Sequence, residues 1–192
     1  MTSESERPAL SPAPILWITG LSGVGKSTLA RSLVAVLRAQ GQRPLLLDGD
    51  ELRQLLEAPE EQDSHLPAQR LQRAWRTARM AQWAALQGIP VIVATISLRH
   101  DVQAWSRAGL APYAEILLQA DLELLRRRKP ALYGAPGGVP VPHVVGIDVV
   151  AEYPIRPELV LQQDFAEGSR SRHLDQALDL WLALRGQPLE AC

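Results

Sequence analysis

The stretch from Gly20 to Ser27 constrains this chain more than any other part of its sequence. It reads Gly-Leu-Ser-Gly-Val-Gly-Lys-Ser and fits the phosphate-binding loop pattern G-x-x-x-x-G-K-S/T at every position. The apolar residues 15–19 before it predict a short buried strand, and the apolar spacing from Thr28 to Gln40 predicts a helix. A glycine-rich loop between a strand and a helix predicts a site where backbone N–H groups and a helix N-terminus hold a polyphosphate.

This loop predicts ATP and Mg²⁺ as ligands. Lys26 would reach the β- and γ-phosphates, and Ser27 would hold Mg²⁺. The chain has two lysines, Lys26 and Lys129, against eighteen arginines. A slim ammonium suits a tight loop better than a planar guanidinium does, which explains a lysine at position 26. The predicted nucleotide contacts are Gly20, Ser22, Gly23, Val24, Gly25, Lys26, Ser27 and Thr28.

The composition is that of one globular domain. The 192 residues are 46 % hydrophobic and 21 % charged, and the net charge of −1 gives no broad attraction to nucleic acid or to a membrane. No apolar run approaches the ~20 residues that span a bilayer. Cys192 is the single cysteine, so no disulfide can form within the chain, which fits a reducing compartment. We therefore expect a cytoplasmic protein with no nucleic-acid or membrane partner.

Predicted strands alternate with predicted helices along the chain. Further strands are expected at 44–47, 90–96, 114–119 and 158–162, with the apolar 90–96 in the centre of the sheet. Helices are expected at 51–56, 67–87, 101–107, 121–128 and 172–184, the last with Leu174, Leu178, Trp181 and Leu182 inward. This order predicts an α/β fold of the P-loop NTPase type, with a five-stranded, mostly parallel sheet and helices on both faces.

Three segments fall outside this alternation. Residues 1–14 and 188–192 are expected to be tails that flank a single P-loop domain at 15–187, and residues 57–66 are expected to form a polar loop. Residues 129–148 are rich in Gly and Pro and lack periodicity. A segment of that length inside a compact domain is often a functional lid, and we expect a lid over 127–148.

Two acidic residues, Asp48 and Asp50, end the second predicted strand. Since carboxyl ends of parallel strands meet at one edge, Asp48 and Asp50 are expected near the γ-phosphate. A carboxylate there could accept a hydroxyl proton, or join Ser27 in holding Mg²⁺. Arg53 could bind an anionic substrate group. The structural alternative is a turn in which Asp caps the next helix.

The run Arg-Arg-Arg-Lys at 126–129 ends a helix beside the expected lid. Arginines that close over the transferred group stabilise its developing charge, and Arg128 is the predicted catalytic contact. The alternative is a solvated cationic helix end, which the helix dipole favours by itself.

The motifs together closely resemble adenylylsulfate kinase. The resemblance rests on the run Ile-Leu-Trp-Ile-Thr-Gly-Leu-Ser-Gly-Val-Gly-Lys-Ser-Thr, on Leu-Leu-Asp-Gly-Asp-Glu-Leu-Arg, and on Val-Gly-Ile-Asp, and it covers residues 15–161. It implies phosphorylation of the 3′-hydroxyl of adenosine 5′-phosphosulfate by MgATP, and often a homodimer. It implies Asp48 as the base, Arg127 as the match of the lid arginine, and acceptor contacts at Asp50, Arg53, Arg70, Arg73, Ser97 and Ile147.

Several positions depart from the family pattern. Two phenylalanines that clamp the substrate adenine in the family are matched by His65 and Val144, and Arg73 replaces an asparagine contact. A lid lysine is replaced by Pro142. Losing both aromatic walls should weaken adenine binding, unless His65 or Trp75 supplies a substitute stack.

The run Val-Val-Gly-Ile-Asp is similar to that of the family's cytidine diphosphoramidate kinase branch, which favours an acceptor other than adenylylsulfate. A rival hypothesis is a nucleotide-dependent switch or sensor that phosphorylates no acceptor. The sequence contains no Asn-Lys-x-Asp guanine motif, which argues against a GTPase-type switch.

Overall fold

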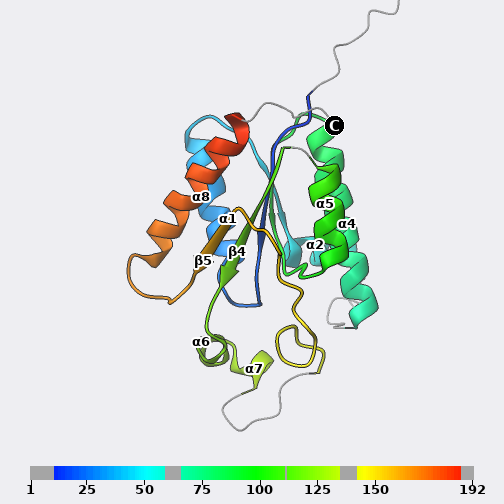
Figure 1. Ribbon diagram of the computed structural model, residues 1–192, viewed down its shortest axis with the longest axis vertical. Coiled ribbons are helices and arrows are strands. Elements are labelled where there is room, and N and C mark those ends of the chain that lie inside the picture. Colours follow the sequence, from blue (N-terminus) through cyan, green and yellow to red (C-terminus); the bar gives the residue numbers. More distant parts are fainter. Residues whose placement is uncertain (1–10, 59–65, 111, 135–141, 187–192) are drawn as a thin grey trace, which may run out of the picture.

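The computed structural model describes residues 11–58, 66–110, 112–134 and 142–186. Its centre is a five-stranded sheet in the order β2-β3-β1-β4-β5, and every neighbouring pair is parallel (Figure 1). The strands are β1 (Ile15–Thr19), β2 (Leu45–Asp48), β3 (Val91–Ala94), β4 (Tyr113–Gln119) and β5 (Leu159–Gln162). The predicted five-stranded sheet is thus confirmed and is parallel throughout; β3 is a fully buried interior strand between β2 and β1, and β1 holds the middle position.

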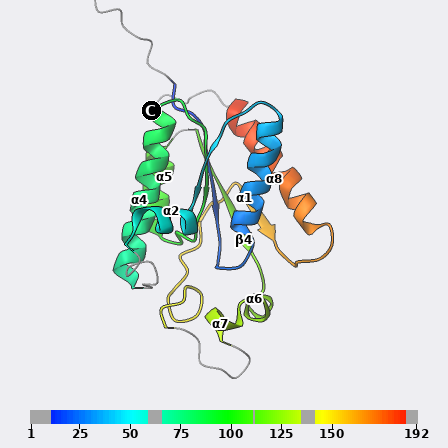
Figure 2. The same cartoon turned by 180° about the vertical axis from the view of Figure 1, so that it is seen from behind.

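Helices cover both faces of the sheet, as predicted. On one face lie α1 (Lys26–Ala39) and α8 (Ser169–Gly186), and on the other lie α2 (Gly49–Leu56), α4 (Pro67–Leu86) and α5 (His100–Gly109) (Figures 1 and 2). Two short helices, α6 (Leu122–Arg128) and α7 (Pro130–Tyr133), lie beyond the carboxyl ends of the strands. The sequence did not predict α7, which Pro130 begins at a position where a helix needs no N–H donor.

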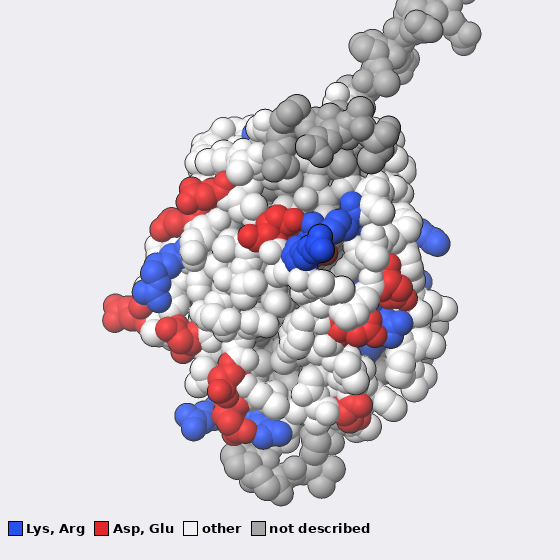
Figure 3. Space-filling model, in the orientation of Figure 1, with Lys and Arg blue, Asp and Glu red and all other residues white. Residues whose placement is uncertain are grey.

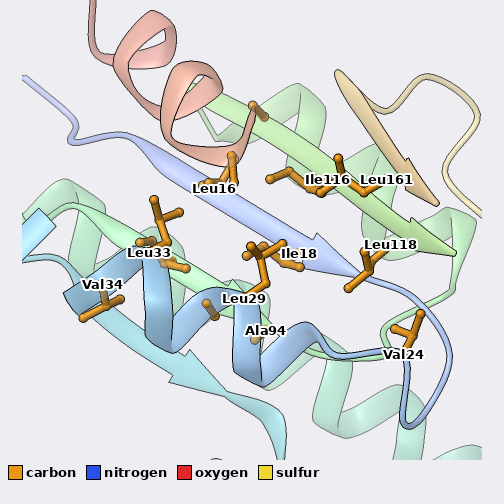
Figure 4. Close-up of a cluster of buried hydrophobic side chains, with 14 of the residues drawn as sticks. Leu16, Ile18, Val24, Leu29, Leu33, Val34, Ala94, Ile116, Leu118 and Leu161 are labelled. Carbon is orange, nitrogen blue, oxygen red and sulfur yellow. The ribbon is translucent and has the colours of Figure 1, made fainter. Parts of the chain in front are cut away.

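Each face of the sheet has its own apolar core. Alternate residues of the strands, such as Leu16 and Ile18, pack against Leu29 and Leu33 of α1 (Figure 4). The other alternate residues, such as Trp17, pack against the alanine face of α4. Because both faces of the sheet are covered, β3 and the residues Ile15 to Ile18 of β1 are apolar and buried at every position rather than at every second one.

The buried face of α8 is rotated from the predicted one: Trp181 is buried and Leu174 and Leu178 are half-buried as expected, but Leu182 is not. Leu182 is 48 % exposed, whereas His173, Ala177, Trp181 and Leu184 are buried. Trp181 fixes this orientation, because it is fully buried and its Nε1 donates a hydrogen bond to Oε1 of Gln42 at 3.0 Å. Leu182 follows Trp181 by about 100° around the helix and so faces outward.

The ends of the expected domain are described in part. Ala13 is buried and its N–H donates to the carbonyl of Ala85 at 2.9 Å, while the carbonyl of Pro14 accepts from Val91 at 2.9 Å. The residues 1–10, 59–65, 111, 135–141 and 187–192 lie outside the described residues, and they include His65, most of the expected N-terminal tail, all of the expected C-terminal tail and part of the expected lid. In the described part of the chain, no helix combines the length and the apolar character needed to cross a bilayer. Basic and acidic side chains are interspersed over the face in Figure 3.

Candidate active site

The loop between β1 and α1 has a backbone that glycine alone can adopt easily. Gly20 has φ 145°, and a Cβ built there would lie 2.1 Å from the carbonyl oxygen of Leu118. Gly25, with φ 110°, is the N-cap of α1 in a left-handed conformation. These glycines let the chain wrap tightly at the helix N-terminus, which is the geometry of a phosphate-binding loop.

Lys26 lies inside this loop. Its side chain is buried, and Nζ donates a hydrogen bond to the carbonyl oxygen of Leu21 at 2.8 Å. Burial is the largest cause that lowers the pKa of Lys26 to about 8, with a smaller lowering by Lys129 and opposing effects of Asp50 and Asp48. A desolvated ammonium beside backbone donors is electrostatically suited to an anion such as a phosphate group.

The other predicted nucleotide contacts differ in what they can offer. The side chain of Val24 is fully buried in the core, so a ligand can meet only its backbone. Ser22, Gly23 and Ser27 are half-buried, and the side chain of Thr28 is exposed. The roles of these residues as phosphate contacts remain predictions.

Asp48 lies at the carboxyl edge of the sheet, beside the end of β3. It pairs with Ala94, which also pairs with Ile18, so β3 separates it from β1. Gly49 makes this close packing possible, because a Cβ there would lie 2.9 Å from Oγ1 of Thr95. The sequence placed the ends of these strands near one another, and the structure brings them to the same edge with one strand between them.

The carboxylate of Asp48 is buried and has two partners. Its Oδ1 accepts the backbone N–H of Asp50 at 3.0 Å, so the capping alternative considered from sequence is present. Its Oδ2 lies 3.4 Å from Nη2 of Arg31, which also pairs with Glu51 at 2.9 Å. Sequence reasoning missed Arg31, although it stands one helical turn after Ser27 on the same face of α1.

This arrangement fits a magnesium site completed by substrate. Mg²⁺ is usually bound through one or two carboxylates together with waters and phosphate oxygens rather than by an all-protein cage. Among the described residues, no three His, Cys, Asp or Glu side chains gather into such a cage. Ser27 and Asp48 therefore stay the predicted ligands, and the ion would neutralise the developing charge of the transferred phosphoryl group.

The arginines predicted to bind the acceptor lie where α2 meets α4. Nη2 of Arg53 donates to Oδ1 of Asp50 at 2.7 Å. Arg73 donates two hydrogen bonds to Glu57, from Nε at 2.7 Å and from Nη2 at 2.6 Å. Burial, followed by repulsion from Arg73, lowers the pKa of Arg70, so an anion beside Arg70 would relieve an unfavourable charge.

The Val-Gly-Ile-Asp run forms a compact turn that packs on the phosphate loop. The carboxylate of Asp148 accepts the N–H groups of His143 and Val144, each at 2.6 Å, and these bonds hold its pKa below the usual range. Gly146 lies against Leu21, where a Cβ would come within 3.0 Å of the leucine side chain. The half-buried Ile147 is thereby placed beside the loop.

Ser97 follows β3 and has an unusual backbone. Its φ is 22°, and its Oγ lies 3.4 Å from Oγ1 of Thr95. Thr19 supports the same segment by donating to the carbonyl of Ile96 at 2.5 Å. The segment after β3 is therefore held at the carboxyl edge of the sheet, where Ser97 was predicted to bind the acceptor.

The structure describes one of the two positions that lost a family phenylalanine, Val144, and one of the two proposed substitute stacking groups, Trp75. Val144, at a position of a family phenylalanine, is 2 % exposed within the core. Trp75 packs against Trp105 of α5, edge to face at 5.5 Å between ring centroids. It lies two residues from Arg73, about 200° away around α4, and so faces away from the α2 side.

Arg128 stacks on the only phenylalanine of the chain. Its Cζ lies 4.0 Å from the ring centroid of Phe165, which follows β5. A cation over an aromatic face is stabilised by about 0.5–2 kcal/mol. To act on a transferred phosphoryl group, the guanidinium of Arg128 would therefore have to leave Phe165.

The strand order and the loop between β1 and α1 define the chain as a P-loop nucleotide-binding protein. Comparison with known sequences is more specific. The chain belongs to the adenylylsulphate kinase family, whose sequence profile matches residues 13–162.

Individual relatives support both branches of the sequence resemblance. A cytidine diphosphoramidate kinase of Campylobacter jejuni is 34 % identical over 144 residues, which cover 73 % of this chain and 81 % of the relative. An adenylyl-sulfate kinase of Burkholderia ambifaria is 38 % identical over 149 residues, covering 76 % and 80 %. The structure of a Mycobacterium tuberculosis APS kinase in complex with AMPPNP and APS superposes with a TM-score of 0.72 at 28 % identity, covering 90 % of this chain and 97 % of that one.

Proposed function

We propose that this protein transfers the γ-phosphate of MgATP to a hydroxyl group of a small nucleotide-type acceptor. One observation supports this most directly. The buried carboxylate of Asp48 lies at the same edge of the sheet as the phosphate loop, and its negative charge raises the pKa of Lys26 in that loop. Membership of the adenylylsulphate kinase family and the kinase names of the relatives support the same reaction class.

The proposed roles follow from the positions of the side chains. Lys26 would exchange its hydrogen bond to the carbonyl of Leu21 for one to a phosphate oxygen. Asp48 would orient the attacking hydroxyl and accept its proton, and with Ser27 would hold Mg²⁺. Residues 127–148 are proposed to act as the lid that excludes water during transfer.

The acceptor is proposed to be a 5′-substituted nucleotide, either adenosine 5′-phosphosulfate or a related conjugate. Arg53, Arg70 and Arg73 would bind its anionic 5′ part, and an anion beside Arg70 would offset the burial and the repulsion from Arg73 that lower the pKa of Arg70. Asp50, Ser97 and Ile147 are the remaining proposed contacts. The buried Val144 in place of an aromatic residue argues against the family's adenine clamp, and the Val-Val-Gly-Ile-Asp run and the Campylobacter jejuni relative favour a cytidine diphosphoramidate-like acceptor.

Asp48→Asn tests the assignment. The substitution keeps the size and the capping oxygen but removes the base, so acceptor phosphorylation should fall by at least about 10³-fold while MgATP still binds. The assay would follow ADP release and the phosphorylated product with adenosine 5′-phosphosulfate and with cytidine and uridine diphosphate conjugates. Full turnover by Asp48→Asn would contradict the proposed role.

A nucleotide-dependent switch stays a second candidate, and it predicts ATP hydrolysis that a partner protein stimulates but no small acceptor does. A cytoplasmic location, which the composition suggests, and a homodimer, which the family resemblance implies, are likewise proposals. Light scattering of the purified protein tests the homodimer directly.

A further inference from the structure

The second lysine of the chain also lies at the phosphate loop. Lys129 is the C-cap residue that follows α6, and its Nζ is 3.3 Å from Oγ of Ser22. Its aliphatic stem covers Gly23, where a built Cβ would lie 3.1 Å from Cδ of Lys129. In a chain that otherwise uses arginine as its cation, both lysines therefore meet at one loop.

The backbone holds Lys129 in this place. Its N–H donates to the carbonyl of Leu125 at 2.8 Å, and its own carbonyl accepts from Leu132 and Tyr133 at 3.0 Å each. The hydroxyl of the buried Tyr133 donates to the carbonyl of Ser22 at 2.8 Å. The connection between α6 and α7 thus packs on the phosphate loop at Ser22, and it places the ammonium of Lys129 beside that residue.

The charges around Lys129 are unbalanced. No carboxylate of the described residues lies within ion-pair distance of its ammonium, whereas Arg126 on the same helix end pairs with Glu123 at 2.5 Å. Lys129 also disfavours the charged form of Lys26. Two cations at one small loop repel each other, and an anion between them would convert that repulsion into attraction on both sides.

We propose that Lys129 is a second phosphate-binding lysine, which contacts the β- or γ-phosphate of ATP bound in the loop from Gly20 to Ser27. A flexible ammonium can follow phosphate oxygens as a point charge without the fixed geometry of a guanidinium. The proposal rests on ATP binding by this loop and is independent of which acceptor is phosphorylated.

Three substitutions at position 129 separate charge from packing. Lys129→Gln keeps much of the stem over Gly23 and a donor for Ser22, but removes the charge. Lys129→Arg keeps the charge, and Lys129→Ala removes both. The matched control is Arg126→Gln, which removes a cation from the same helix end where it pairs with Glu123.

Isothermal titration calorimetry with MgATP and MgADP, without any acceptor, gives the readout. A lost charge-assisted hydrogen bond to phosphate should raise the ATP dissociation constant of Lys129→Gln and Lys129→Ala by roughly tenfold or more. Lys129→Arg and Arg126→Gln should stay within about threefold of the wild type. A loss for ATP alone supports a γ-phosphate contact, and a loss for both nucleotides supports a β-phosphate contact.

Unchanged ATP affinity in Lys129→Gln would overturn the proposal, as would an equal loss in Arg126→Gln, because the effect would then belong to the general field of the helix end. A wild-type protein that binds ATP but phosphorylates no acceptor would contradict the proposed reaction and leave this binding test unaffected.

Discussion

The guanidinium of Arg31 joins helix α1 to Asp48, with 3.4 Å between Nη2 and Oδ2. The same nitrogen lies 2.9 Å from Oε1 of Glu51, so Arg31 bridges the buried carboxylate and the exposed start of α2. A helix that begins at the phosphate loop thereby sets the position of the proposed base and metal ligand. The guanidinium of Arg31 and a bound Mg²⁺ would both be attracted to the carboxylate of Asp48, so they should compete for it.

Removing Arg31 should therefore strengthen activation by Mg²⁺. In Arg31→Gln, the Mg²⁺ concentration for half-maximal activity should fall by roughly two- to fivefold, a small effect because the arginine is largely exposed. Initial rates over a Mg²⁺ series at saturating ATP give this constant. The control is Arg38→Gln, which removes a cation from the last turn of the same helix, and an equal shift in that variant would contradict direct competition.

The buried charge of Lys26 should strengthen nucleotide binding but lower the free energy of unfolding of the nucleotide-free protein. Burial lowers its pKa from 10.5 to about 8, so the folded state holds the proton less tightly than the unfolded state does. At neutral pH, below both values, this difference costs about 3 kcal/mol, and it vanishes only above the unfolded value.

Lys26→Met should raise the free energy of unfolding of the nucleotide-free protein by about 1–3 kcal/mol, since the buried charge is lost together with one hydrogen bond. The same substitution should weaken MgATP binding by at least about 100-fold. Urea denaturation and calorimetry measure the two effects. A destabilised variant would show that the hydrogen bond to Leu21 outweighs the burial of the charge.

The two lid arginines can be distinguished by comparing Arg127→Ala with Arg128→Ala. If Arg128 stabilises the transferred phosphoryl group, its loss should lower kcat by roughly 10³-fold, while ATP affinity changes little. Single-turnover kinetics at saturating ATP measure this step. A large loss in Arg127→Ala with none in Arg128→Ala would assign the contact to Arg127 and leave Arg128 as the partner of Phe165.

The ion pairs of Arg107 with Glu115 and Glu158, near the starts of β4 and β5, should affect the stability of the fold and not ATP binding. Arg107 donates to the buried Glu115 at 2.8 Å and to Glu158 at 2.6 Å. Arg107→Ala leaves Glu115 buried without this partner and should cost about 1–3 kcal/mol, a value reduced for the partial exposure of the arginine. Thermal unfolding measures the cost, and Arg185→Ala on α8 is the exposed control. A loss of ATP affinity would contradict a purely structural role.

The same network predicts how the stability difference between the wild type and Arg107→Ala depends on pH. Burial raises the pKa of Glu158, but the hydrogen bonds from Arg107 and from the N–H of Glu115 outweigh it and lower the pKa below 4.5. A lowered carboxyl pKa contributes stability that is present above the unfolded value and is lost as pH falls through the folded value. The stability gap between wild type and Arg107→Ala should narrow below pH 4.5, and a constant gap from pH 7 to pH 3 would contradict this linkage.

Much of the fold could be predicted because it depends on local patterns. Short apolar runs bounded by turn residues were enough to predict the five strands. The spacing of the glycines before Lys26 was enough to predict that this lysine lies in a loop between the first strand and the first helix. The error at Leu182 has a tertiary cause, since the bond from Trp181 to Gln42 decides which side of α8 faces α1.

The parts of the site that the sequence did not predict are contacts over long distances in the chain. Tyr133 and Lys129 meet Ser22 across 111 and 107 positions, and no local pattern encodes such a pairing. Arg31 approaches Asp48 because of how α1 crosses β2, which is a property of packing. Phe165 has a left-handed backbone after β5 and meets Arg128 for the same kind of reason.

The most direct test of the account is a transfer assay with isolated protein, MgATP and either adenosine 5′-phosphosulfate or cytidine and uridine diphosphate conjugates. We expect ADP to form only when an accepted conjugate is present, in equal amount to a product phosphorylated on a hydroxyl group, and Asp48→Asn to form neither. ADP release at the same rate without any acceptor, with inorganic phosphate as the product, would contradict an acceptor kinase.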